Sequence, residues 1–117
     1  MAEIKMVDEE SFALEVTKSG IPTLVDFWTP QCVPCKNLSV VLDKFSQTME
    51  GKLKIVKVNA EESTGLASRL GIRGVPTLML FCSGKAVGTK TGFLLPHELR
   101  QWIASCLPEN TNQPWER

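Results

Sequence analysis

The sequence predicts an α/β protein with a central mixed sheet of about five strands flanked by four helices. Apolar runs with strand character alternate with apolar residues at helical spacing along most of the chain. Residues 23–58 read as a strand–helix–strand unit, whose two strands lie parallel and whose crossover is right-handed. A turn at Ser83–Lys85 joins the last two strands into an antiparallel hairpin. The sheet is therefore expected to contain both kinds of pairing.

The N-terminal elements are a short strand, a helix and a buried strand. Residues 4–7 predict the first strand, and Asp8 is a suitable cap for the helix that follows. Gly20 and Pro22 then interrupt the chain. Residues 23–28 predict a strand that is buried on both faces, because apolar and polar residues do not alternate cleanly in it.

The remaining elements complete the alternation. A long helix is predicted by the helical spacing of Leu38, Val41, Leu42, Phe45 and Met49. Residues 53–58, rich in β-branched side chains, predict the next strand, and residues 64–70 a short helix. Residues 77–81 and 86–91 form the hairpin. A final amphipathic helix is predicted by Leu99, Trp102, Ile103, Cys106 and Leu107.

The length of 117 residues fits a single domain, which we expect over residues 1–107. Residues 108–117 are polar, contain two prolines, and are expected to form a flexible tail. Lys+Arg and Asp+Glu both number 13, so nothing indicates a nucleic-acid surface or a polybasic membrane patch. We find no membrane span and no secretory signal, and expect a cytoplasmic monomer. In a reducing compartment, a close cysteine pair favours a catalytic or metal-binding role.

That pair lies in the stretch WTPQCVPCK, residues 28–36. Cys32 follows a buried strand and begins a predicted helix, at the edge where α/β sheets usually place their chemistry. Free N–H groups and the helix dipole stabilise an anion there. A thiol with a pKa of ~8.5 is only ~3% ionised at pH 7, and lowering that pKa by ~1.5 units makes it about half thiolate. Cys32 is therefore a candidate nucleophile.

Cys35 lies one turn further along the helix and is expected to point inward. An exposed thiolate at Cys32 would attack a disulfide, and the buried thiol of Cys35 would resolve the mixed disulfide. Pro34 suits the first helical turn, where its missing N–H has no partner to lose.

Zinc is the alternative reading of two cysteines at this spacing. A structural zinc site needs four ligands, and the remaining candidates, Cys82, Cys106 and His97, do not form a second paired motif. We therefore expect no metal. Cys82 and Cys106 are interpreted as ordinary half-buried cysteines, one at a strand end and one on an apolar helix stripe.

Several motifs together resemble the thioredoxin family. Val25-Asp-Phe-Trp28 leads into the cysteine pair, and Cys-Val-Pro-Cys-Lys36 resembles the family's Cys-Gly-Pro-Cys-Lys. The segment Gly71-Ile-Arg-Gly-Val-Pro-Thr77 resembles its cis-proline loop, and further positions fall at the usual spacing: Phe81, Gly84 and Gly92. The resemblance extends from about residue 20 to 107. It implies the thioredoxin fold and a reversible Cys32–Cys35 disulfide.

The resemblance also implies roles around the pair. Asp26, inside an apolar strand, would be a buried acid whose pKa is raised by desolvation and which accepts the Cys35 proton. Lys57, in the neighbouring strand, is a candidate charge partner of Asp26, and the alternative is a solvent-facing lysine. A cis Pro76 would leave the Val75 backbone free to pair with an extended substrate.

Trp28, Gly74 and Gly92 would complete a shallow apolar groove for that substrate. Two residues depart from the family pattern. Gln31 stands where thioredoxins commonly have tryptophan, and Val33 replaces the usual glycine within the pair. The loss of an aromatic anchor at Gln31 should change partner choice. Val33, β-branched and before a proline, restricts the backbone and is placed to crowd a partner over Cys32.

The sequence is therefore interpreted as a disulfide reductase without a bound cofactor, acting on client proteins with disulfides. The sequence contains no nucleotide-binding motif. The resemblance implies that electrons come from NADPH through a flavin-containing thioredoxin reductase. Two alternatives stay open. One is an oxidant or isomerase with a redox potential shifted by Val33. The other is a binding module that uses the groove at Trp28 and Pro76 without turnover.

Overall fold

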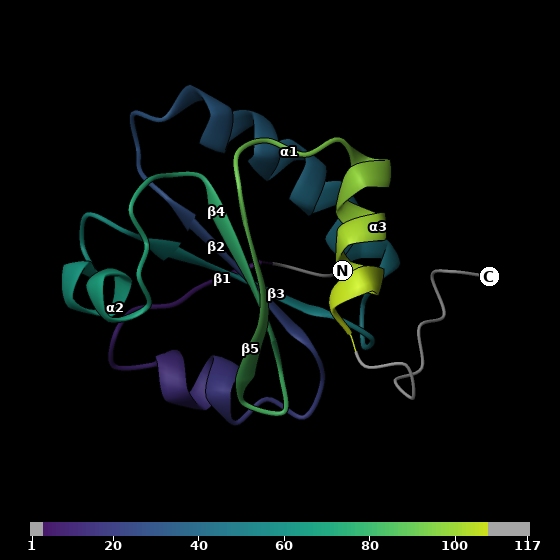
Figure 1. The fold of residues 1–117 in the computed structure, drawn as a ribbon, viewed down its shortest axis with the longest axis horizontal. Coiled ribbons are helices and arrows are strands. Elements are labelled where there is room, and N and C mark those ends of the chain that lie inside the picture. The colour runs from purple at the N-terminus through teal and green to yellow at the C-terminus, as the bar shows by residue number, and fades with distance from the viewer. Residues whose placement is uncertain (1–3, 108–117) are drawn as a thin grey trace.

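A five-stranded mixed sheet forms the centre of the computed structural model, which describes residues 4–107 (Figure 1). The strands lie in the order β1-β3-β2-β4-β5. Their bounds are β1 Lys5–Met6, β2 Thr23–Trp28, β3 Lys54–Asn59, β4 Thr77–Cys82 and β5 Lys85–Thr91. β1, β3 and β2 pair in parallel, whereas β4 pairs antiparallel with both β2 and β5. The predicted α/β class and mixed sheet are confirmed.

Four helices cover the two faces of the sheet. They are the π-helix η1 Ala13–Thr17, and α1 Val33–Thr48, α2 Thr64–Arg69 and α3 Pro96–Cys106. The α1 and α3 helices pack on one face, and η1 and α2 on the other (Figure 1). A three-layer arrangement of this kind buries both faces of the sheet, which explains the continuous apolar run that predicts β2.

The side chains of β2 alternate between the two cores. Leu24 packs with α1 and α3, and Val25 and Phe27 pack with η1 and α2. Asp26 is two residues from Leu24, so its carboxylate points to the α1 side of the sheet. The sequence therefore places one acidic group inside the core that the N-terminal half of α1 covers.

Asp8 was expected to cap the first helix, and its Oδ1 accepts the Ser11 N–H, three residues on, at 2.9 Å, as an N-capping side chain does. Ser11 Oγ accepts the Asp8 N–H in return at 3.1 Å. The helical turn that Asp8 caps leads into η1, which is π-helical from Ala13. The Glu15 carboxylate then binds Lys5 at 2.8 Å and Lys54 at 2.7 Å, which fixes η1 against the sheet.

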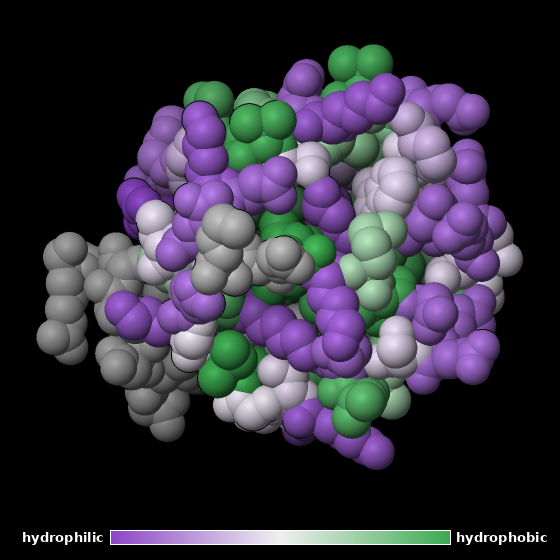
Figure 2. All heavy atoms as spheres, turned by 180° about the vertical axis from the view of Figure 1, so that it is seen from behind, coloured by the Kyte–Doolittle hydropathy of each residue, from purple (hydrophilic) through white to green (hydrophobic). Residues whose placement is uncertain are grey.

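The surface of the described part shows no broad apolar area on the face in Figure 2, where hydrophobic residues lie in small separate groups among hydrophilic ones. Within residues 4–107, no helix has the length and apolar character needed to cross a membrane. The tail expected at residues 108–117 lies outside the described residues.

Candidate active site

The cysteine pair lies at the N-terminus of α1. Cys32 is the residue that caps the helix, and the structure joins Cys32 and Cys35 by a disulfide with Cα atoms 5.2 Å apart. Cys32 is half-buried, whereas Cys35 is only 3% exposed. The two sulfurs therefore differ in access, although they are only three residues apart.

The backbone at the helix start is oriented toward Cys32. The Cys35 N–H donates to Cys32 Sγ at 3.1 Å, and it belongs to the first helical turn, where N–H groups lack partners within the helix. After reduction, the same N–H and the helix dipole favour negative charge on the Cys32 sulfur. This geometry suits a cysteine that reacts as a thiolate.

Asp26 lies in the middle of β2 and is 1% exposed. Neither of its carboxylate oxygens has a hydrogen-bond partner among the described residues. Burial raises the pKa of Asp26 from 3.8 to about 7, because desolvation of the carboxylate outweighs the opposing charge of Lys57. Asp26 is thus an acid whose protonation changes near neutral pH.

Lys57 lies directly across from Asp26 in the parallel pairing of β2 with β3. Both residues face α1, but Lys57 Nζ donates a hydrogen bond to Ser39 Oγ on α1. Within residues 4–107, Asp26 takes part in no ion pair. Lys57 lowers the pKa of Asp26 through charge alone and lies in a half-buried environment rather than in open solvent.

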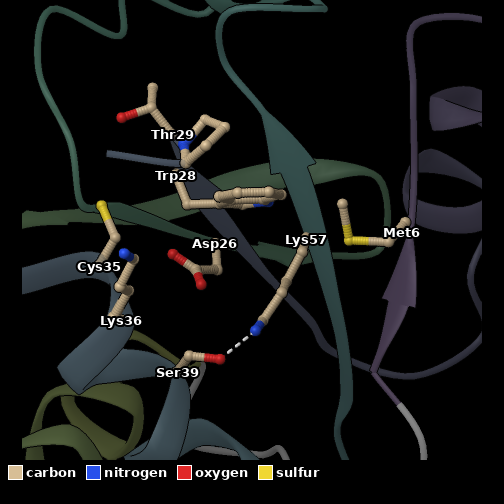
Figure 3. Close-up of a pocket in the computed structure, with 9 residues that line it drawn as sticks. Met6, Asp26, Trp28, Thr29, Cys35, Lys36, Ser39 and Lys57 are labelled. Atoms are coloured by element: carbon tan, nitrogen blue, oxygen red, sulfur yellow. Dashed lines mark hydrogen bonds between the residues drawn. The ribbon is translucent and has the colours of Figure 1, made fainter. Parts of the chain in front are cut away.

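A pocket of about 340 Å³ joins these groups (Figure 3). Figure 3 shows the Asp26 carboxylate between Cys35 and Lys57, with the Trp28 ring beside it. The Trp28 indole Nε1 is also buried without a partner among the described residues. The lining of the pocket is mainly apolar, but its size admits water beside the unpartnered oxygens of Asp26 and Trp28 Nε1, so a water-mediated path from Cys35 to Asp26 is sterically open. The lining residues are Met6, Asp26, Trp28, Thr29, Pro30, Cys35, Lys36, Ser39 and Lys57.

The proline loop precedes β4, and its Val75–Pro76 peptide bond is cis. Two hydrogen bonds hold this loop. The Gly92 N–H donates to the Pro76 carbonyl at 2.9 Å, and Thr77 Oγ1 donates to the Gly74 carbonyl at 2.6 Å. Gly92 has a φ of +92°, a conformation that glycine adopts without strain.

Gly74 and Val75 line a groove of about 540 Å³ that α2 completes with Ala67 and Ser68. Trp28 lines the Asp26 pocket, and Thr29 lines both that pocket and this groove. The substrate groove that the sequence predicts from Trp28, Gly74 and Gly92 stays a prediction. The contribution of α2 was missed, because its contacts depend on how the helix packs rather than on a local motif.

The residues around Cys32 are open to solvent. Gln31 and Pro34 are exposed, and Val33 is 63% exposed, so all three are accessible to a docking partner. Phe93 and Leu95, which follow Gly92, are also exposed apolar residues, and neither was among the predicted site residues.

Metal ligands do not gather in the described part of the chain. Within residues 4–107, no group of three or more His, Cys, Asp or Glu side chains is arranged to hold a metal ion. Cys82 and Cys106 are free and half-buried, and both pack against the core on the α1 and α3 side.

Comparisons with known proteins agree with this geometry. The family model described as Thioredoxin matches residues 3–105. A protein named Thioredoxin from Rickettsia felis is 42% identical over 97 residues, covering 83% of this chain and 92% of its own. Thioredoxin 1 from a Nostoc species is 45% identical over 103 residues, covering 88% and 96%. Thioredoxin from Haemophilus influenzae is 38% identical with the same coverage.

Proposed function

Because the chain belongs to the thioredoxin family and is a thiol–disulfide oxidoreductase, a protein disulfide reductase, we propose that Cys32 is its nucleophile and Cys35 its resolving cysteine. The observation that carries this assignment is the difference in access between the two sulfurs at the start of α1. Only the Cys32 side is open to a protein-sized disulfide, and the first-turn N–H groups favour a thiolate there.

In the first step, the Cys32 thiolate attacks one sulfur of the substrate disulfide. A bond forms between Cys32 and that sulfur, the substrate S–S bond breaks, and the other substrate sulfur leaves as a thiolate that takes up a proton. The protein and substrate are then joined by a mixed disulfide.

In the second step, Cys35 loses its proton and attacks Cys32 Sγ. The mixed disulfide breaks, the Cys32–Cys35 bond closes, and the second substrate thiolate leaves and is protonated. Two electrons have then passed from the dithiol to the substrate, and the substrate has two thiols. The exchange needs no bound cofactor.

We propose that Asp26 accepts the Cys35 proton, directly or through a water in the shared pocket. A general base works best when its pKa lies near the working pH, and burial raises the pKa of Asp26 to about 7. An ordinary exposed aspartate, with a pKa of ~3.9, would be a far weaker base. Lys57 acts in this site as a positive charge beside Asp26, and its effect opposes that of burial.

We further propose that an extended substrate segment pairs with the Val75 backbone next to the cis Pro76. The groove lined by Gly74 and Val75 would receive the segment, and Gly92 would hold the proline loop through its hydrogen bond to the Pro76 carbonyl. The remaining contacts would come from the rim of Cys32 and its neighbourhood, namely Trp28, Gln31, Val33 and Pro34.

The oxidised pair must be reduced again after each turnover. As electron donor we propose a flavin-containing thioredoxin reductase that uses NADPH. We also propose that residues 1–107 form a single domain that works as a monomer in the cytoplasm, where disulfide-containing clients are its partners. The even balance of 13 basic and 13 acidic residues gives no support for nucleic acid as a partner.

Reduction of insulin by dithiothreitol, followed as turbidity from the released B chain, tests the cysteine assignment. The wild-type protein should accelerate it, whereas Cys32→Ser should not. Cys82→Ser and Cys106→Ser are matched controls outside the site and should retain the activity. Full activity of Cys32→Ser would contradict the assignment, and a reduction potential well above that of cytosolic reductases would favour an oxidant or isomerase.

A further inference from the structure

One polar residue on the inner side of α1 has no part in the chemistry described so far. Ser39 follows Cys35 by one helical turn, so the two side chains lie on the same face of α1. The other inward residues of the helix near this point are apolar: Cys35, Leu38 and Leu42. Ser39 lines the Asp26 pocket and accepts the hydrogen bond from Lys57 Nζ (Figure 3).

We propose that Ser39 is a positioning residue, whose hydroxyl holds the Lys57 ammonium toward α1 and away from the Asp26 carboxylate. The contact matters because the register of β2 and β3 places Lys57 next to Asp26. Asp26 and Lys57 are direct neighbours across β2 and β3, with both side chains on the α1 side of the sheet. Opposite charges on neighbouring strands that face the same side attract each other. Here the lysine is bound to Ser39, and both Asp26 oxygens lack a hydrogen bond within the described residues.

Among residues 4–107, few charged groups face Asp26. From α1, Lys36 and the Cys35 sulfur line the pocket, and from β3 Lys57 does so. From β4, the residue paired with Asp26 is Leu78, which carries no charge. The β1 strand contributes Met6, again without charge. Among these groups, Lys57 is the cation whose charge lowers the pKa of Asp26 against the effect of burial. The distance from the Lys57 ammonium to the carboxylate therefore determines how large this lowering is.

Removal of the Ser39 hydroxyl would leave the Lys57 ammonium without its acceptor in a half-buried pocket. A half-buried ammonium is stabilised most by a hydrogen bond to a carboxylate that has no other partner. The carboxylate of this kind that lines the same pocket is that of Asp26. An opposite charge within ~4–6 Å lowers a carboxyl pKa by about 1–3 units. The variant should therefore have a more acidic Asp26, which is a weaker base.

The consequence for turnover rests on the proposed role of Asp26 as the acceptor of the Cys35 proton. With Lys57 held by Ser39, the carboxylate stays desolvated and unpaired, and it can take a proton near neutral pH. With Lys57 paired to it, the carboxylate would be stabilised, and the resolving step would slow. Ser39 would thus adjust the second step of the exchange without contact with substrate.

The test is the pKa of Asp26 itself, measured in the oxidised protein by carboxyl ¹³C NMR. Ser39→Ala should lower this pKa by about 1 unit. Ser39→Thr, which keeps a hydroxyl, should restore it toward the wild-type value. Gln47→Ala is the matched control, because Gln47 is an exposed polar residue of the same helix outside the pocket, and it should leave the pKa unchanged.

A double-mutant cycle with Lys57→Met separates positioning from general structural effects. In the Lys57→Met background, Ser39→Ala should no longer lower the pKa, because the cation is gone. An unchanged pKa in Ser39→Ala, or an equal fall with and without Lys57, would overturn the proposal. If the pKa moves as expected but Asp26→Asn resolves mixed disulfides at the wild-type rate, the positioning role stands. Only the proposed role of Asp26 as proton acceptor then fails.

Discussion

Replacement of Asp26 by asparagine should stabilise the oxidised protein, and the gain should grow with pH. The carboxylate is 1% exposed and has no hydrogen bond among the described residues, so its ionised form is disfavoured in the folded state. Asparagine has nearly the same shape and cannot ionise. Comparison of the two proteins therefore isolates the cost of the charge.

The magnitude follows from the pKa in each state. Burial raises the pKa of Asp26 from 3.8 to about 7 in the folded protein. Between these values the unfolded chain loses the proton while the folded protein keeps it, so stability falls as pH rises. The loss begins near the unfolded pKa and ends above the folded one. At ~1.4 kcal/mol per unit, it amounts to about 4 kcal/mol of unfolding free energy.

Urea unfolding of both proteins, followed by circular dichroism at several pH values, measures this difference. The stability of Asp26→Asn minus that of wild type should rise by about 4 kcal/mol between about pH 4 and about pH 8. The buried amide adds an offset that does not vary with pH, and other titrating groups cancel in the difference. A difference that is flat across this range, or that falls with pH, would refute the desolvation argument.

Three further outcomes are expected. Val33→Gly should speed the reduction of protein disulfides but not of small disulfides. Val33 is 63% exposed beside Cys32, where its side chain would obstruct only a large partner. Reduction kinetics with insulin and with cystine would show the difference. Glu15→Gln should destabilise the protein at neutral pH and much less near pH 2, because Lys5 and Lys54 lower the pKa of Glu15 to about 2. The stabilising effect of the Glu15 carboxylate is present above its unfolded pKa of 4.5 and is lost as pH falls toward 2, which urea unfolding of both proteins at several pH values would detect. Leu42→Ala, at a fully buried position of α1, should cost about 2–5 kcal/mol in the same assay.

Most of the architecture was predictable, because its signals are local. The apolar run of β2 and the helical spacing in α1 each specify an element and its buried faces. The capping role of Asp8 was a local signal of the same kind, because its carboxylate accepts the N–H three residues on. The π-helical geometry of η1, in which the Lys18 N–H donates to the Ala13 carbonyl at 2.9 Å, was not predictable, because no local motif in the segment specifies it.

The site, too, has a part that the sequence predicts and a part that it does not. The cysteine pair, the buried Asp26 and the proline loop each follow from a local pattern or a family resemblance. Ser39 was missed, because its role depends on a contact between α1 and β3 that no single segment encodes. A signal existed all the same, since Ser39 is a polar residue one turn after Cys35, between the apolar inward residues Leu38 and Leu42.

The difference between the two cysteines is most directly tested by trapping mixed disulfides. In Cys35→Ser the first step proceeds and the second cannot, so covalent complexes with client proteins should accumulate in cells and disappear on reduction. The same complexes should be absent from Cys32→Ser and from Cys32→Ser/Cys35→Ser. Accumulation of adducts in Cys32→Ser, or their absence from Cys35→Ser while the wild-type protein reduces disulfides, would contradict the assignment of nucleophile and resolving cysteine.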